Sequence, residues 1–250
     1  MSAPARLRAD LVCGIGLLTR LPTGWLARAG LPYSMARSIW CWPLVGAGLG
    51  AAAAWLYASL LWLGIRPLPA AGWSVAMLLL LCGGLHEDGL ADMADGCGGG
   101  VERARKLEIM RDSRVGSYGV MALVVALLVR ITAVASMPGP AAMLALPVAG
   151  ALARASMVAL LWRLPPARGD GLASTMPTLP RAALVACLCL AASVTALLLH
   201  GPRMLAAGAV AVMATLVMCA LARWQIGGQT GDVLGATAVV TECAVLTALC

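Results

Sequence analysis

Three aspartates at helical spacing are the residues of this sequence best suited to chemistry. Asp88, Asp92 and Asp95 stand at positions i, i+4 and i+7, so a helix places their carboxylates on one face. Seven of the eleven acidic residues lie between Glu87 and Asp112, and like charges this close repel each other. Mg²⁺ would offset this repulsion, because it binds carboxylate oxygens and takes further ligands from substrate phosphates. The cluster therefore predicts a Mg²⁺ site for phosphoryl transfer, with the three aspartates as ligands and catalytic residues.

The two residues just before this face have different predicted roles. His86 is a candidate catalytic residue that could orient a ligand or act as a base, and an interfacial histidine is the alternative. Glu87 lies about a quarter turn from the aspartate face, so we expect it to be solvated rather than to bind metal.

A second polar segment precedes an apolar run. Arg111 and Arg114 lie about one helical turn apart, with Asp112 between them. Guanidinium groups match phosphate oxygens in bidentate fashion, so these three residues are predicted to bind substrate phosphate. An ordinary basic flank of a membrane helix is the alternative. Arg20 is a further candidate for the same phosphates, or an interfacial arginine whose charged head reaches water.

A third segment, Gly-Gly-Gln-Thr-Gly-Asp over 227–232, precedes the last apolar run. Such glycine-rich polar turns suit contacts with a phosphate, a ribose or a base, so Thr230 and Asp232 are predicted substrate-binding residues. A connecting loop with Asp232 as the N-cap of the following helix is the alternative. Glu242 then falls inside an apolar run, and Arg154 is its candidate partner in a pair that is either functional or structural.

The elements that hold these segments are predicted to be membrane helices. Hydrophobic residues make up 61% of the chain and charged residues 12%, about half the charge of an ordinary soluble domain. The alternating pattern of a membrane β-barrel is absent from the sequence. We therefore expect an all-α, polytopic helix bundle with about seven transmembrane helices. Their approximate ranges are 40–63, 69–85, 116–135, 140–161, 182–199, 204–222 and 233–250. The stretch 11–18 is too short to cross and is expected at the interface or as a re-entrant segment.

Arginines set the expected orientation. With the N-terminus cytoplasmic, fourteen basic residues fall in inside segments and only Arg66 and Arg203 in outside loops, which satisfies the positive-inside rule. The net charge of +7 follows from that rule, so no nucleic-acid partner is expected. All three polar segments then face the cytoplasm, which favours an enzyme at the inner membrane of a bacterium over a transporter.

The chain is expected to form one membrane-embedded catalytic domain over residues 1–250. Within it, 1–37 is the N-terminal cytoplasmic or interfacial segment, and 86–115 is the cytoplasmic catalytic segment. The nine cysteines show no metal-ligand spacing and are expected to be reduced.

The motifs taken together resemble the cobalamin synthase family, the adenosylcobinamide-GDP ribazoletransferases. The resemblance covers essentially the whole chain in order. It rests on Thr19-Arg20-x-Pro22, Trp42-Pro43-Leu44-Val45-Gly46, His86-x-Asp88-Gly89-Leu90-Ala91-Asp92-x-x-Asp95-Gly96, Leu107-Glu108-Ile109-Met110-Arg111-Asp112-Ser113-Arg114-x-Gly116 and Gly227-Gly228-x-Thr230-Gly231-Asp232-x-Leu234-Gly235-Ala236. Leu17 departs from the aromatic residue that is common before the Thr-Arg pair, and the glycine run after Gly96 is unusually long.

The resemblance implies a reaction that the residues alone do not specify. Members of the family join adenosylcobinamide-GDP to α-ribazole or its 5′-phosphate, release GMP and use Mg²⁺, and they are integral inner-membrane proteins. The implied partners are these substrates and the lipid bilayer. A homo-oligomer, or association with other enzymes of the cobalamin pathway, is a further candidate. The preferred acceptor, the number of metal ions, the general base and the guanine-binding residues are not specified.

Three other classes of membrane protein also use clustered acidic residues. A CDP-alcohol phosphotransferase has repeated aspartates at a membrane face, but the 227–232 segment argues against it. A UbiA-type prenyltransferase also binds Mg²⁺ and diphosphate, but breaks a carbon–oxygen bond. A cation transporter would place charged residues at mid-membrane in several spans, whereas here the acids gather mostly at one face.

Overall fold

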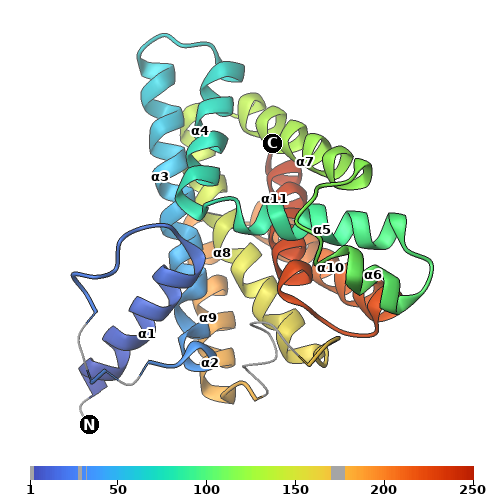
Figure 1. The fold of residues 1–250 in the computed structure, drawn as a ribbon. Coiled ribbons are helices and arrows are strands. Elements are labelled where there is room, and N and C mark those ends of the chain that lie inside the picture. The colour runs from blue at the N-terminus through green and yellow to red at the C-terminus, as the bar shows by residue number, and fades with distance from the viewer. Residues whose placement is uncertain (1–2, 28–29, 32, 170–177) are drawn as a thin grey trace.

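The computed structural model describes residues 3–27, 30–31, 33–169 and 178–250, and these residues form helices and connections without a β-strand (Figure 1). The helices are α1 (Ala3–Leu18), α2 (Met35–Ser38), the 3₁₀ turn η1 (Ile39–Cys41), α3 (Trp42–Trp62), α4 (Pro67–Cys82), α5 (Leu85–Gly99), α6 (Arg103–Ile109), α7 (Ser117–Ser136), α8 (Gly139–Arg163), α9 (Arg181–Leu198), α10 (Pro202–Ile226) and α11 (Gly231–Leu249).

Most of these helices are membrane spans. Among the described residues, six helical segments are long and apolar enough to cross a bilayer, and the bent pair α4–α5 brings the number to as many as seven. This confirms the predicted all-α, polytopic bundle. The six are Met35–Trp62, Ser117–Ser136, Gly139–Arg163, Arg181–Leu198, Pro202–Ile226 and Gly231–Leu249. The stretch 11–18 belongs to α1, which is not among the candidate spans.

The α4–α5 pair is sharply bent between its two helices. α5 leaves α4 at 90° and runs across the neighbouring helices in Figure 1. Gly83 and Gly84 make this turn with φ of 66° and 67°, the left-handed region in which glycine has no steric penalty. The helix α5, which carries the acidic cluster, therefore does not continue the direction of α4.

Helix α8 is the centre of the bundle. Most of its length is buried, and α3, α9, α10 and α11 pack around it. Small residues allow close approach, as is typical of membrane helices. A Cβ on Gly46 of α3 would collide with the Gly150 carbonyl of α8, and a Cβ on Gly50 would collide with the Leu146 carbonyl. The two helix backbones are therefore in direct contact along this face.

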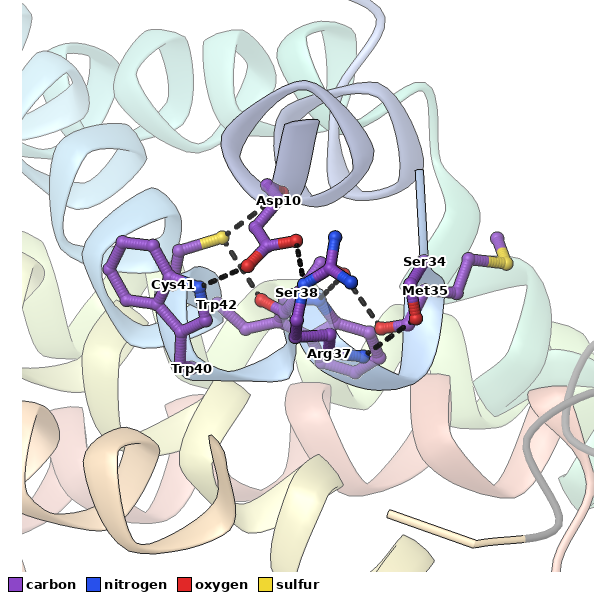
Figure 2. A network of polar contacts seen from close by, with 8 residues as sticks. All are labelled: Asp10, Ser34, Met35, Arg37, Ser38, Trp40, Cys41 and Trp42. Carbon is purple, nitrogen blue, oxygen red and sulfur yellow. Dashed lines mark hydrogen bonds and ion pairs between the residues drawn. The ribbon is translucent and has the colours of Figure 1, made fainter. Parts of the chain in front are cut away.

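A buried carboxylate fixes α1 against the start of the first span (Figure 2). Asp10 accepts hydrogen bonds from Arg37 Nε at 2.7 Å and from Trp40 Nε1 at 3.0 Å. Just after α1, the Arg20 amide donates to the Leu81 carbonyl of α4 at 2.7 Å. The C-terminal turn of α1 is thereby held beside the α4–α5 turn, where it forms one wall of the site described below.

The polar connections on one side of the bundle are joined to each other. The Ala167 amide donates to the Gln229 carbonyl at 2.8 Å, and the Gln229 amide donates to the Pro165 carbonyl at 2.9 Å. Arg103 of α6 adds a bond from Nη2 to the Ala167 carbonyl at 2.9 Å. The α8–α9 and α10–α11 connections therefore lie together with α6, at the end of the bundle that carries α5.

The α3–α8 contact makes a testable prediction. Gly46→Val places a side chain on the α8 backbone, which cannot give way, so we expect a loss of about 1–3 kcal/mol or more in the free energy of unfolding. Gly48→Val is the matched control, because Gly48 lies on the same helix with open space around its Cα. Thermal unfolding in detergent micelles measures both. Equal unfolding temperatures would contradict direct backbone packing.

Candidate active site

Helix α5 crosses the first turn of α11 at two glycines. A Cβ on Gly89 would come within 2.7 Å of the Asp232 carbonyl, and a Cβ on Gly235 within 3.1 Å of the His86 backbone. The contact at Gly89 requires glycine, because a larger residue would push the two helices apart, and the contact at Gly235 is tight. The crossing sets Asp232 of α11 beside the acidic face of α5, so two segments that are far apart in the sequence form one site.

Three carboxylates converge at this crossing. Asp88 is exposed, while Asp92 and Asp232 are partly buried. Burial, and then the negative charges of Asp88, Asp232 and Asp95, raise the pKa of Asp92 to about 7. The site thus concentrates negative charge that a bound cation would relieve.

Asp95, the third predicted ligand, is turned toward α7. Its carboxylate accepts hydrogen bonds from the backbone amides of Gly116 at 2.7 Å and Gly119 at 2.8 Å. These amides belong to the start of α7 and have no partner within that helix. Asp95 therefore caps α7 from another helix, and each of its oxygens keeps a second lone pair.

The carboxylates fit Mg²⁺ in one of its usual binding modes. Among the described residues, no group of three or more His, Cys, Asp and Glu side chains is arranged to hold a metal ion. Mg²⁺ commonly binds through one or two carboxylates, keeps several waters and takes its other oxygens from substrate phosphates. Asp88 and Asp92 on one face of α5 supply such a pair, so the donor set fits a metal held jointly by protein and substrate.

A cavity of about 240 Å³ opens beside these carboxylates. Its polar lining residues are His86, Asp88, Arg168, Gln229, Thr230 and Asp232. The side chains of His86 and Gln229 are 3% and 2% exposed, and His86 Nε2 and Gln229 Oε1 find no hydrogen-bond partner among the described residues. Buried polar atoms are normally paired, so these two are available to a ligand.

The predicted residues of the last segment meet at this cavity. Thr230 is the N-cap of α11, since its hydroxyl accepts from the Val233 amide at 3.3 Å, so the alternative of Asp232 as the cap is wrong. Thr230 Oγ1 also donates to Asp232 Oδ2 at 3.1 Å. Arg168 Nη2 lies 3.3 Å from the same oxygen. Sequence reasoning did not select Arg168, because only the fold brings the α8–α9 connection to α11.

The other predicted phosphate ligands lie outside the cavity lining. The Arg20 side chain rests against Gly83 at the turn that leads into α5. Arg111, Asp112 and Arg114 lie exposed on the α6–α7 connection. Arg114 Nη2 pairs with Asp112 Oδ2 at 2.7 Å, and the hydrogen bonds from Arg114 lower the pKa of Asp112 to about 2.

Behind α5 lies a buried network of four charges. Arg130 Nη1 contacts Glu87 Oε1 at 2.8 Å and Glu242 Oε2 at 3.4 Å, and Arg154 pairs with the other oxygen of Glu242. The expectation that Glu87 is solvated is wrong: its side chain is 13% exposed, because it neutralises Arg130 from α7. The pairing of Arg154 with Glu242 is confirmed.

Known proteins resemble the chain along its whole length. A sequence model of a family described as cobalamin-5-phosphate synthase matches residues 10–250. A protein of Bradyrhizobium diazoefficiens named adenosylcobinamide-GDP ribazoletransferase is 41% identical over 95% of this chain and 92% of its own length. Proteins of the same name from Azorhizobium caulinodans and Mesorhizobium japonicum are 41% and 39% identical over 97% and 98% of this chain, and over 95% and 93% of their own lengths. No solved structure matches the chain.

The buried network makes a prediction about stability. Glu242→Gln leaves Arg154 without its carboxylate in an apolar bundle, and breaking a buried pair in this way costs about 3–5 kcal/mol. Glu108→Gln is the control, because Glu108 pairs with Arg105 at the exposed surface. Chemical unfolding in micelles gives both values. Replacing both partners, as Arg154→Met with Glu242→Met, should recover part of the loss, and a Glu242→Gln protein as stable as the control would contradict the network.

The contacts of Asp95 make a second prediction. Asp95→Ala leaves the buried amide of Gly119 without an acceptor, at a cost of about 1–3 kcal/mol, and the part-buried amide of Gly116 adds a smaller loss. Asp88→Ala is the comparison, since Asp88 is exposed and its removal relieves repulsion within the cluster. Unfolding is measured in chelator, so that metal binding does not contribute. If both variants lose the same stability, Asp95 does not cap α7.

Proposed function

Because the chain belongs to the cobalamin-5-phosphate synthase family, we propose that it is an adenosylcobinamide-GDP ribazoletransferase. It joins adenosylcobinamide-GDP to α-ribazole, or to α-ribazole 5′-phosphate, and releases GMP. The product is adenosylcobalamin or its 5′-phosphate, and the reaction is the last step of nucleotide-loop assembly in cobalamin biosynthesis. The observation that carries this proposal is that Asp88 and Asp232 line one cavity large enough for part of a nucleoside, with Asp92 near both of them on α5.

We propose that Mg²⁺ is held by the aspartates of α5. Asp88 and Asp92 present free carboxylate oxygens, and Asp95 stays a predicted ligand through its remaining lone pairs. Asp232 faces them from α11. When bound, Mg²⁺ neutralises the diphosphate and lowers the charge that opposes attack by an oxygen nucleophile.

In the substitution at phosphorus, one bond to phosphorus forms and one breaks. A secondary hydroxyl oxygen of the ribose forms a bond to the phosphorus on the cobinamide side, and the bond from that phosphorus to the bridging oxygen breaks. The 5′-position takes no part, because it carries the phosphate when α-ribazole 5′-phosphate is the acceptor. The electron pair leaves with GMP. One of the carboxylates, or the imidazole of His86, accepts the hydroxyl proton. The protein contributes chiefly by positioning the two substrates and stabilising charge.

Positive side chains near the carboxylates are suited to the departing phosphate. Arg168 lies beside Asp232, and Arg20 lies at the turn that leads into α5. Guanidinium groups at these places would pair with phosphate oxygens that the metal leaves uncovered. Arg111 and Arg114 on the α6–α7 connection stay predicted phosphate ligands.

We propose that the site faces the cytoplasm from a bacterial inner membrane. The support is the distribution of arginine and lysine, which concentrates in the segments that share a side with α5 and α6. Nucleotide substrates are cytoplasmic compounds, so this orientation gives them direct access.

The proposed reaction is tested with adenosylcobinamide-GDP, α-ribazole and Mg²⁺ added to purified protein in detergent. We expect GMP and a cobalamin product, with turnover abolished by chelator. Asp92→Asn should lower the rate by about 10²-fold or more, because a metal-binding carboxylate is lost.

Glu108→Gln is the matched control and should keep the wild-type rate. Absence of product from well-folded wild-type protein would refute the assigned reaction. Full activity of Asp92→Asn would keep the reaction but refute the metal site on this face.

A further inference from the structure

We propose that the 240 Å³ cavity between α1, α3, α5, α8 and α11 is the binding subsite for the apolar bicyclic base of α-ribazole. This inference rests on the proposed function and goes further, since it names which part of which substrate the cavity receives. The cobinamide and guanosine parts of the other substrate then bind elsewhere.

Size limits what the cavity holds. Sites for drug-sized ligands begin at roughly 300 Å³, so a cavity of about 240 Å³ accommodates one bicyclic ring with part of its sugar. A corrin macrocycle is far larger. The candidates are therefore the three bases in the reaction: guanine, the adenine of the adenosyl group, and dimethylbenzimidazole.

The lining favours dimethylbenzimidazole. The apolar lining residues are Leu17, Leu18, Trp42, Leu85, Met157 and Leu234. Guanine and adenine both carry hydrogen-bonding groups around their edges, and an apolar wall would leave these groups unpaired at a cost of about 1–3 kcal/mol each. Dimethylbenzimidazole has one free ring nitrogen and two methyl groups, so most of its surface gains from contact with such a wall.

The apolar side of the cavity is held in place. Trp42 Nε1 already donates to Ser38 Oγ at 3.3 Å (Figure 2), so the indole offers its apolar surface to the cavity. Leu17 and Leu18 end α1, which the Asp10–Arg37 pair fixes to the same segment. The wall is therefore formed before a ligand binds, which lowers the entropic cost of binding.

The polar groups of the cavity match the remaining atoms of α-ribazole. His86 Nε2 and Gln229 Oε1 are buried and find no partner among the described residues. An imidazole N–H donates to a ring nitrogen, and an amide oxygen accepts from a ribose hydroxyl. Asp88 and Asp232 line the same cavity from α5 and α11. A nucleoside with its base on the apolar side therefore presents its sugar to the carboxylates at which we propose that Mg²⁺ and the diphosphate bind.

The test fills the cavity with a larger side chain and measures the KM of each substrate separately. Leu17→Trp extends an aromatic ring from α1 into the base site, and we expect the KM for α-ribazole to rise about 10–100-fold, the effect of forcing extra atoms into a packed space. The KM for adenosylcobinamide-GDP and the inhibition constant of GMP should stay within about twofold of wild type, inside the usual scatter between independent sites. Leu80→Trp, at an exposed position on α4, is the matched control.

A second measurement uses wild-type protein alone, so it does not depend on the folding of a variant. The α-riboside of unsubstituted benzimidazole lacks two methyl groups, each of which contributes about fourfold to affinity when buried. We expect its KM to exceed that of α-ribazole by about tenfold, while guanosine does not compete with α-ribazole.

The outcomes separate the two proposals. If wild-type protein makes no cobalamin from the two substrates, the proposed function and the subsite both fail. If it makes cobalamin and Leu17→Trp leaves the KM for α-ribazole unchanged, the subsite alone is refuted. A rise in the GMP inhibition constant of Leu17→Trp would instead assign the cavity to guanine, as would competition by guanosine.

Discussion

Neutralisation of charge inside an apolar bundle is the constraint on which this structure depends. Arg130 and Arg154 are almost completely buried, and a charge at that depth is tolerated only with a partner. Glu87 and Glu242 supply two negative charges to two positive ones. The network connects α5, α7, α8 and α11, so it also holds the acidic helix against the bundle beyond the 90° turn from α4.

The site follows from that attachment. With Glu87 anchored, the next turn of α5 meets α11 at Gly89, and the carboxylates of the two helices face one cavity. Asp95 then fastens the far part of α5 to the start of α7. Glu87 and Asp95 thus position α5, while Asp88 and Asp92 are the acids of this helix that we propose as metal ligands.

The sequence was sufficient for features that depend on local periodicity. Helical spacing placed Asp88 and Asp92 on one face, and long apolar runs predicted the spans. Features that depend on neighbours in space were not accessible in this way. The amides of Gly116 and Gly119 that Asp95 binds, the position of Arg168 beside Asp232, and the Arg130 partner of Glu87 each require the relative placement of two helices. Arg154 and Glu242 are the exception, because two opposite charges in apolar runs have few other partners.

The buried charged residues also enter the bundle in a fixed order, because a chain is synthesised and inserted from its N-terminal end. Glu87 precedes Arg130, so the α7 arginine finds its carboxylate already present. Arg154 enters with α8, and its carboxylate partner Glu242 belongs to α11, which is synthesised after α8, α9 and α10. Until α11 arrives, the central helix carries an unbalanced charge. The charge of α8 is therefore neutralised by the same helix that brings Asp232 to the site.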